Sequence, residues 1–127
     1  MDKMRIVLRK LRLDSNLQLE VLESFIRKHD ENKKIDAELL ILHIHLLALS
    51  SRKNAKRIKD VIQRSNRYPV DACLEICQEN DIKDAWAYLE LKRGDVNKAI
   101  EIVAEVLFCM IIFAILISYW RKQLRSI

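Results

Sequence analysis

The scarcity of turn-forming residues constrains this chain more than any other feature of its sequence. Gly94 is the single glycine and Pro69 the single proline among 127 residues, where average usage gives roughly nine and six. Hairpins and barrels need glycine, asparagine or proline at their turns, so this composition argues against a sheet architecture. Apolar side chains instead recur at spacings of three and four residues, which is typical of amphipathic helices. The sequence therefore predicts an all-α protein.

Short polar breaks divide the pattern into about seven helices, the last of them strongly hydrophobic. The predicted ranges are about 3–13, 15–28, 36–51, 54–65, 69–79 and 81–93, with a last helix from 95 onward. Ser15 and Gln18 form a predicted capping box. The run LLILHIHLLAL at 39–49 is apolar on nearly all sides, so the third helix is predicted to be central. Short loops make neighbouring helices antiparallel, and such consecutive hairpins stack into an α-solenoid, here a fragment of one.

The last part of the chain differs from the rest. Residues 1–105 form the predicted helical-repeat region, 106–120 a hydrophobic helix and 121–127 a basic tail. The hydrophobic helix has one polar side chain, Ser118, and is flanked by Glu105 and Arg121. At about 1.5 Å per residue it reaches roughly 22 Å, short of the roughly 30 Å hydrocarbon core of a bilayer. Three interpretations stay open: a transmembrane helix, a buried last helix, and the end of a misread reading frame.

Cysteine usage and the N-terminal sequence bear on the cellular compartment. Three cysteines without a framework spacing favour a reducing compartment. Residues 1–13 alternate basic and apolar side chains, which is unlike a signal peptide; an ordinary bundle helix is favoured over a mitochondrial presequence. A membrane-spanning 106–120 would then be a tail anchor with residues 1–100 in the cytosol. The basic flank after residue 120 favours the opposite orientation.

The most specific stretch of sequence runs from Tyr68 to Val103. Small side chains allow helices to approach closely, larger ones pack between them, and an Arg-Gly-Asp corner ends one helix and caps the next. The small residues are Ala72, Ala85 and Ala99, and the packing residues are Leu74, Cys77, Trp86, Leu89 and Ile100. The sequence around the corner reads AYLELKRGD and continues into KAIEIV.

This stretch resembles the clathrin-heavy-chain repeat of the endolysosomal CORVET and HOPS tethering subunits. Within that family it most resembles the CORVET-specific branch. The residues that carry the resemblance are Pro69, Cys73, Leu74, Cys77, Asp84, Ala85, Tyr88, Leu89, Arg93, Gly94, Asp95, Ala99 and Ile100. The resemblance implies a non-catalytic scaffold in endosomal or vacuolar vesicle traffic, on the cytoplasmic face of those membranes. Its expected partners are other tethering subunits or adjacent repeats, with no small-molecule substrate and no cofactor. Family members are much longer and carry a β-propeller, which implies a fragment.

A basic segment between residues 52 and 67 is the surface most suited to an anionic partner. Binding to anionic lipid headgroups would be favoured by about 1 kcal/mol for each basic side chain near the membrane surface. Nucleic acid is disfavoured because no aromatic side chains are interleaved for base stacking. A solvated face, or a contact with the acidic 68–105 stretch of a neighbouring repeat or molecule, stays open as an alternative. The basic residues are Arg52, Lys53, Lys56, Arg57, Lys59, Arg64 and Arg67.

No constellation in the sequence predicts a catalytic, cofactor or metal site. Cys73 and Cys77 could share a helical face, but a structural zinc site needs four ligands, so buried thiols are predicted. His43 and His45 lie about 200° apart around a helix and cannot chelate one metal together; one of them is predicted to face solvent or a partner. Metalloprotease and nucleophile-elbow motifs are missing. The rival to the scaffold is a small tail-anchored membrane protein with a cytosolic helical domain.

Overall fold

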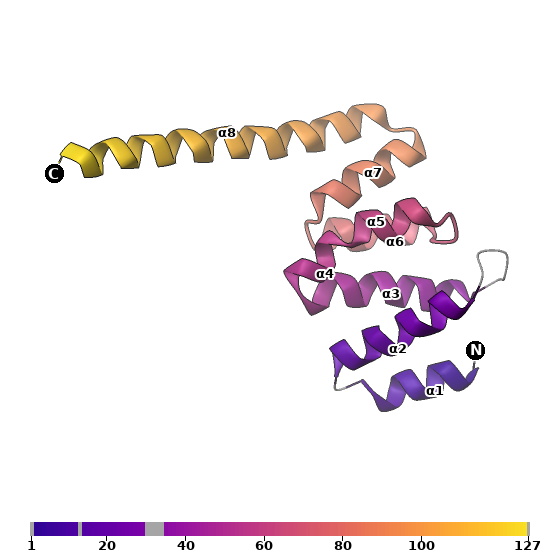
Figure 1. Ribbon diagram of the computed structural model, residues 1–127. Coiled ribbons are helices and arrows are strands. Elements are labelled where there is room, and N and C mark those ends of the chain that lie inside the picture. The colour runs from indigo at the N-terminus through magenta and orange to yellow at the C-terminus, as the bar shows by residue number, and fades with distance from the viewer. Residues whose placement is uncertain (1, 13, 30–34, 127) are drawn as a thin grey trace.

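The computed structural model of this chain describes residues 2–12, 14–29 and 35–126, and within these residues every regular element is a helix (Figure 1). This confirms the predicted all-α fold and its long, apolar last helix. The helices are α1 (Asp2–Lys10), α2 (Ser15–Lys28), α3 (Ala37–Ser50), α4 (Arg52–Lys56), α5 (Ile58–Arg64), α6 (Val70–Glu79), α7 (Lys83–Arg93) and α8 (Val96–Ser126).

Successive helices reverse direction from α1 to α3 and from α6 to α8, and the helices stack in a row (Figure 1). Helix α2 contacts α1 and α3, α3 contacts α6, α6 contacts α7, and α7 contacts α8. The short helices α4 and α5 occupy the stretch for which one helix was predicted. The break falls at Arg57, whose N–H bonds the carbonyl of Asn54, three residues back, and so tightens the last turn of α4.

Helix α3 is the centre of the array, as its sequence predicted. It contacts α2, α4, α5 and α6, so apolar side chains on several of its faces are removed from water. Its buried residues are Leu39, Leu40, His43, Ile44, Leu46 and Leu47.

Two helix ends show how local sequence sets the boundaries. The predicted capping box at Ser15 is wrong: the carboxylate of Asp14 caps α2 by accepting the N–H of Leu17 at 3.1 Å. The Gln18 amide instead donates to the Leu8 carbonyl at 2.7 Å. The corner after α7 is as predicted. Gly94 adopts φ +95°, a left-handed conformation that L side chains rarely take, and the next residue, Asp95, caps α8.

Helix α8 has 31 residues and is therefore about 46 Å long. Its first turns pack on α7 through Ala99 and Ile102, the two residues of α8 that are buried. The remainder projects away from the other helices (Figure 1). The predicted boundaries at 105/106 and 120/121 fall inside this helix and do not interrupt it.

Candidate functional site

The projecting part of α8 carries most of the exposed large hydrophobic side chains of the described residues. An 18-residue window of α8 has a mean hydropathy of 2.8, and 6% of that window is buried. Phe108, Met110, Phe113 and Trp120 each expose more than 60% of their area. A soluble protein rarely exposes a contiguous apolar surface of this kind. By length and composition α8 can cross a membrane, and it is not a buried core helix of this chain.

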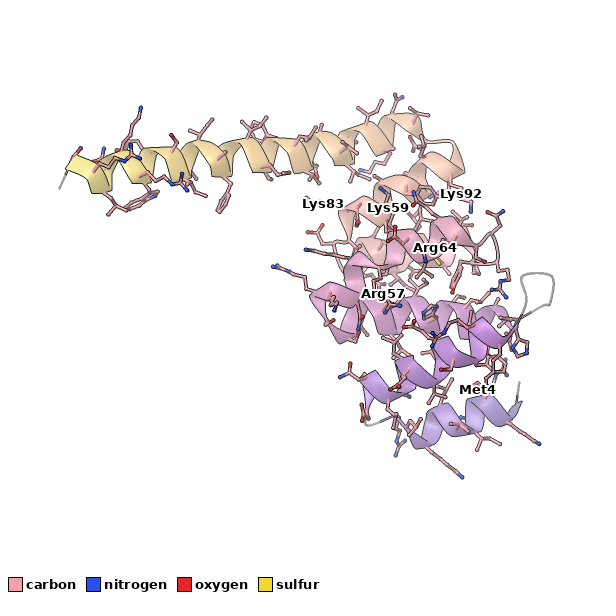
Figure 2. The ribbon with its side chains drawn as sticks, viewed as in Figure 1. Met4, Arg57, Lys59, Arg64, Lys83 and Lys92 are labelled. Atoms are coloured by element: carbon pink, nitrogen blue, oxygen red, sulfur yellow. The ribbon has the colours of Figure 1, made fainter. Side chains whose placement is uncertain are left out.

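The side chains of this segment stand clear of the other helices in Figure 2. The last charged contact between α8 and the body, which we define as helices α1 to α7, is an ion pair. In it the Lys83 ammonium lies 3.6 Å from the Glu105 carboxylate. Beyond Glu105 no described residue is buried. The apolar segment from Val106 to Trp120 therefore begins where packing against the body ends.

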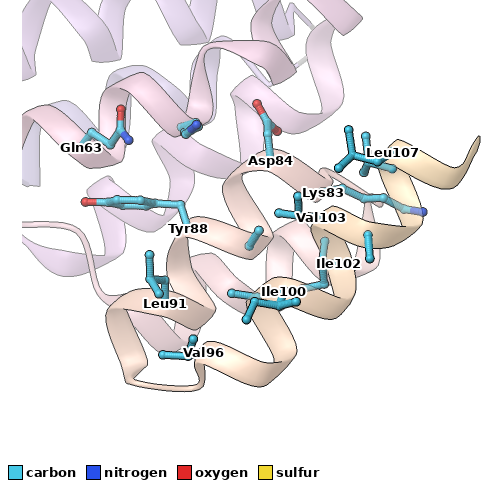
Figure 3. Close-up of a pocket in the computed structure, with 15 residues that line it drawn as sticks. Gln63, Lys83, Asp84, Tyr88, Leu91, Val96, Ile100, Ile102, Val103 and Leu107 are labelled. Atoms are coloured by element: carbon cyan, nitrogen blue, oxygen red, sulfur yellow. The ribbon is translucent and has the colours of Figure 1, made fainter. Parts of the chain in front are cut away.

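An apolar groove of about 850 Å³ lies beside this junction, between α5, α7 and α8 (Figure 3). Its α8 wall includes four aliphatic side chains that are about half exposed, and its α7 wall includes Tyr88 and Leu91. Polar and charged groups lie among the lining residues: Lys59, Gln63, Lys83 and Asp84. The aliphatic side chains are Val96, Ile100, Val103 and Leu107.

Six residues of the repeat-like motif are buried in the array, and its other residues are half-buried or exposed. Arg93, Gly94 and Asp95 form the exposed corner between α7 and α8, and Tyr88 is half-buried. The predicted packing of Ile100 in the core is wrong, because this side chain is 61% exposed on the groove. The buried members are Cys73, Leu74, Cys77, Ala85, Leu89 and Ala99.

The basic residues of the predicted anionic-partner surface are divided among several environments. Arg57 is held by an ion pair with Glu23, and Lys59 lines the groove. Arg67 is half-buried and donates to the Ser65 hydroxyl at 3.2 Å. Among these basic residues only those of α4 and Arg64 are exposed: Arg52, Lys53, Lys56 and Arg64. Binding of an anionic partner by these residues stays a prediction.

A polar cluster between α2, α3 and the α4–α5 break was not anticipated from the sequence. The Arg57 guanidinium donates to both carboxylate oxygens of Glu23, at 2.7 and 3.2 Å. The hydrogen bond to this carboxylate raises the pKa of Arg57. Nδ1 of His43 lies 2.7 Å from the Tyr68 hydroxyl, and Nε2 lies 3.9 Å from the Glu23 carboxylate. His43 and Tyr68 are 25 residues apart in the sequence, and Arg57 and Glu23 are 34 residues apart, so no local motif reveals these pairs.

Burial controls the titration of this cluster and of the two α6 thiols. Desolvation lowers the pKa of His43 to about 4, against an opposing effect of Glu23, so the ring is neutral at pH 7. Desolvation raises the pKa of Tyr68. It also raises the pKa of Cys73 to about 11 and that of Cys77 to about 12. Such thiols are poor nucleophiles.

The predicted burial of both α6 cysteines is confirmed. Of the two α3 histidines, His43 is buried and His45 is half-buried. Among the residues that the structure describes, no three His, Cys, Asp or Glu side chains are placed to hold a metal ion.

No protein-family model, curated protein or solved structure matches the chain.

Proposed function

We propose that this protein is a non-catalytic helical-repeat scaffold attached to a membrane through α8. In this proposal residues 106–120 lie in the bilayer, and the body presents helix faces to other proteins. The observation that carries it is the exposure of the apolar side chains of α8 beyond Glu105. Water is an unfavourable solvent for such a surface, and a bilayer removes it from water.

The ends of the apolar segment suit the two interfaces of a bilayer. Tyr119 and Trp120 are amphipathic aromatic side chains, which favour the headgroup region. Arg121, Lys122 and Arg125 follow them and extend toward anionic headgroups. At the other end Lys83 pairs with Glu105, so this carboxylate has a counter-ion near the membrane surface.

The cellular setting of the scaffold follows from the resemblance of residues 68–103 to the tethering-subunit repeat. On this basis the protein works at the cytoplasmic face of endosomal or vacuolar membranes and binds other tethering subunits. Stacked helical hairpins are a common platform for such contacts. The test is to locate the tagged full-length chain in cells and to ask whether CORVET or HOPS subunits are recovered with it. Recovery at other membranes, without these subunits, would contradict this part of the proposal.

Membrane attachment is tested by alkaline carbonate extraction of the full-length chain. The unchanged protein is expected in the membrane pellet. A variant with Ile112→Arg and Leu116→Arg places two charges in the middle of the segment, each costing about 2.5 to 3.5 kcal/mol at the bilayer centre, and is expected in the soluble fraction. Lys122→Arg is the matched control and should remain in the pellet. Extraction of the unchanged protein would overturn the proposal.

A further inference from the structure

The first turns of α8 carry two apolar stripes, although a helix on the surface of an array needs one. Ala99 and Ile102 form the first stripe and are buried in the packing of α8 on α7. The second stripe, which we call the seam, comprises Val96, Ile100, Val103 and Leu107. These four side chains are 48 to 61% exposed and form one wall of the groove in Figure 3.

The spacing of the seam is that of a coiled coil. Its members alternate in steps of four, three and four residues, which are the a and d positions of a heptad repeat. The same alternation continues into the apolar segment through Met110, Ala114 and Ile117. A second α8 helix running alongside would therefore meet apolar side chains at every a and d position from residue 96 to residue 117.

No charged residue of α8 flanks this seam. The e and g positions beside it are Asn97, Ala99, Ala104 and Val106, so two copies would meet without like-charge repulsion.

The charged side chains of the same turns are engaged on the other faces of α8. Lys98 lies 3.6 Å from Glu101 and 5.6 Å from the ring centroid of Trp86. Glu105 pairs with Lys83.

The rim of the groove favours a second copy of this chain over a strongly charged partner. We define this rim as the three charged residues that line the groove, Lys59, Lys83 and Asp84, so both signs are present. A partner of one sign would meet repulsion from part of this rim. In a two-fold dimer the same patch faces itself, and a mixed rim allows a cation of one copy to lie near an acid of the other.

We propose that the protein forms a homodimer in which α8 of a second copy packs in parallel along the seam. The parallel direction rests on the proposed membrane attachment, because two copies inserted into one bilayer from the same side have α8 helices that point the same way. The shared bilayer also holds both seams in one orientation, which raises their effective concentration.

Cysteine cross-linking of the full-length chain in lipid nanodiscs tests the register. With Cys109→Ser as background, Ile100→Cys and Val103→Cys each place a thiol on the seam. Oxidation is expected to join these variants into disulfide dimers. Glu101→Cys is the matched control, because residue 101 points away from the seam, and it should remain monomeric. Equal cross-linking at 100 and 101, or none at 100 and 103, would overturn the proposal.

A second measurement uses the chain with its native cysteines in detergent micelles and follows its mass by sedimentation. The unchanged protein is expected to be a dimer, and Ile100→Glu, which sets two carboxylates against each other, is expected to weaken association at least tenfold. Circular dichroism should show that this variant keeps its helices, because Ile100 is 61% exposed. If the unchanged protein is monomeric, the proposal is overturned. This outcome is expected if the groove binds a helix of another protein instead.

Flotation of the same cysteine variants, mixed with lipid vesicles in a density gradient, separates this inference from the proposed function. Chains that float and do not cross-link overturn the dimer and leave membrane attachment standing. Chains that cross-link at 100 and 103 and do not float support the dimer and contradict membrane attachment.

Discussion

The ammonium of Lys83, the first residue of α7, lies 3.6 Å from the carboxylate of Glu105 on α8. The pair joins the start of one helix to the tenth residue of its antiparallel neighbour. Before it, Ala99 and Ile102 of α8 are buried; after it, no described residue is. The pair therefore marks the place where α8 changes from a packed helix into a projecting one.

Reversing this pair should show its contribution. Lys83→Glu and Glu105→Lys are each expected to lower the free energy of unfolding by up to about 1 kcal/mol, because the side chains are 28 and 57% exposed and water screens them. The double variant restores an attractive pair and should recover most of the loss. Chemical denaturation in micelles at low and high salt measures both effects. Losses that simply add in the double variant would contradict the pairing.

Arg57 connects α4 and α5 to α2 through Glu23, whose side chain is 20% exposed. Arg57→Met leaves this carboxylate without its two guanidinium hydrogen bonds, and the free energy of unfolding is expected to fall by about 1 to 3 kcal/mol. Lys56→Met is the matched control, since Lys56 is exposed, and should change stability by less than about 0.5 kcal/mol. Equal effects of the two substitutions would show that the cluster does not secure α2.

His43 should make stability depend on pH. Its pKa is about 4 in the folded chain against 6.5 for the unperturbed group, so the unfolded state binds the proton first. The free energy of unfolding is therefore constant above about pH 6.5 and falls as pH decreases toward 4, by about 3 kcal/mol in total. Denaturation of the unchanged chain and of His43→Gln across this range measures the difference. A slope that survives unchanged in His43→Gln would assign it to other groups.

The two α6 thiols should be unreactive in the folded protein. Cys73 and Cys77 are buried, with pKa values raised to about 11 and 12, whereas Cys109 is exposed on α8. In micelles a small maleimide at pH 7.5 is expected to leave Cys73 and Cys77 unlabelled, and in denaturant it should label all three cysteines. In vesicles a membrane-impermeant maleimide should label none, because residue 109 lies in the proposed bilayer segment. Labelling of Cys109 in vesicles would contradict this placement.

The features that the sequence predicted are those that local pattern controls. Apolar spacing and the scarcity of glycine and proline suffice for a helical array, because each helix buries its own stripe against its neighbours. Gly94 and Asp95 mark the corner between α7 and α8 because the left-handed turn and the cap each need a particular residue type. The run 39–49 predicted the central helix because it has almost no polar face.

The features that were missed depend on distant partners. Arg57 was assigned to an outward basic face, and its pairing with Glu23, 34 residues away, leaves no mark in the surrounding sequence. Ile100 follows the same three-and-four spacing as buried residues, so its exposure on the groove is visible only once α7 and α5 are placed. One helix was predicted for residues 54–65, because the sequence around the break at Arg57 contains neither glycine nor proline.

Measuring the depth of α8 residues in a bilayer tests membrane attachment most directly. Nitroxide labels placed singly at residues 101, 105, 109, 113, 117 and 121 of the full-length chain in vesicles report their accessibility to oxygen and to a polar nickel complex. We predict that the ratio of oxygen to nickel accessibility peaks near residue 113 and falls toward residues 101 and 121, as for a helix that crosses the membrane. A ratio that is low throughout, or that varies with a period of 3.6 residues in a complete label scan of 101–121, would place α8 in water or flat on the surface and contradict the account.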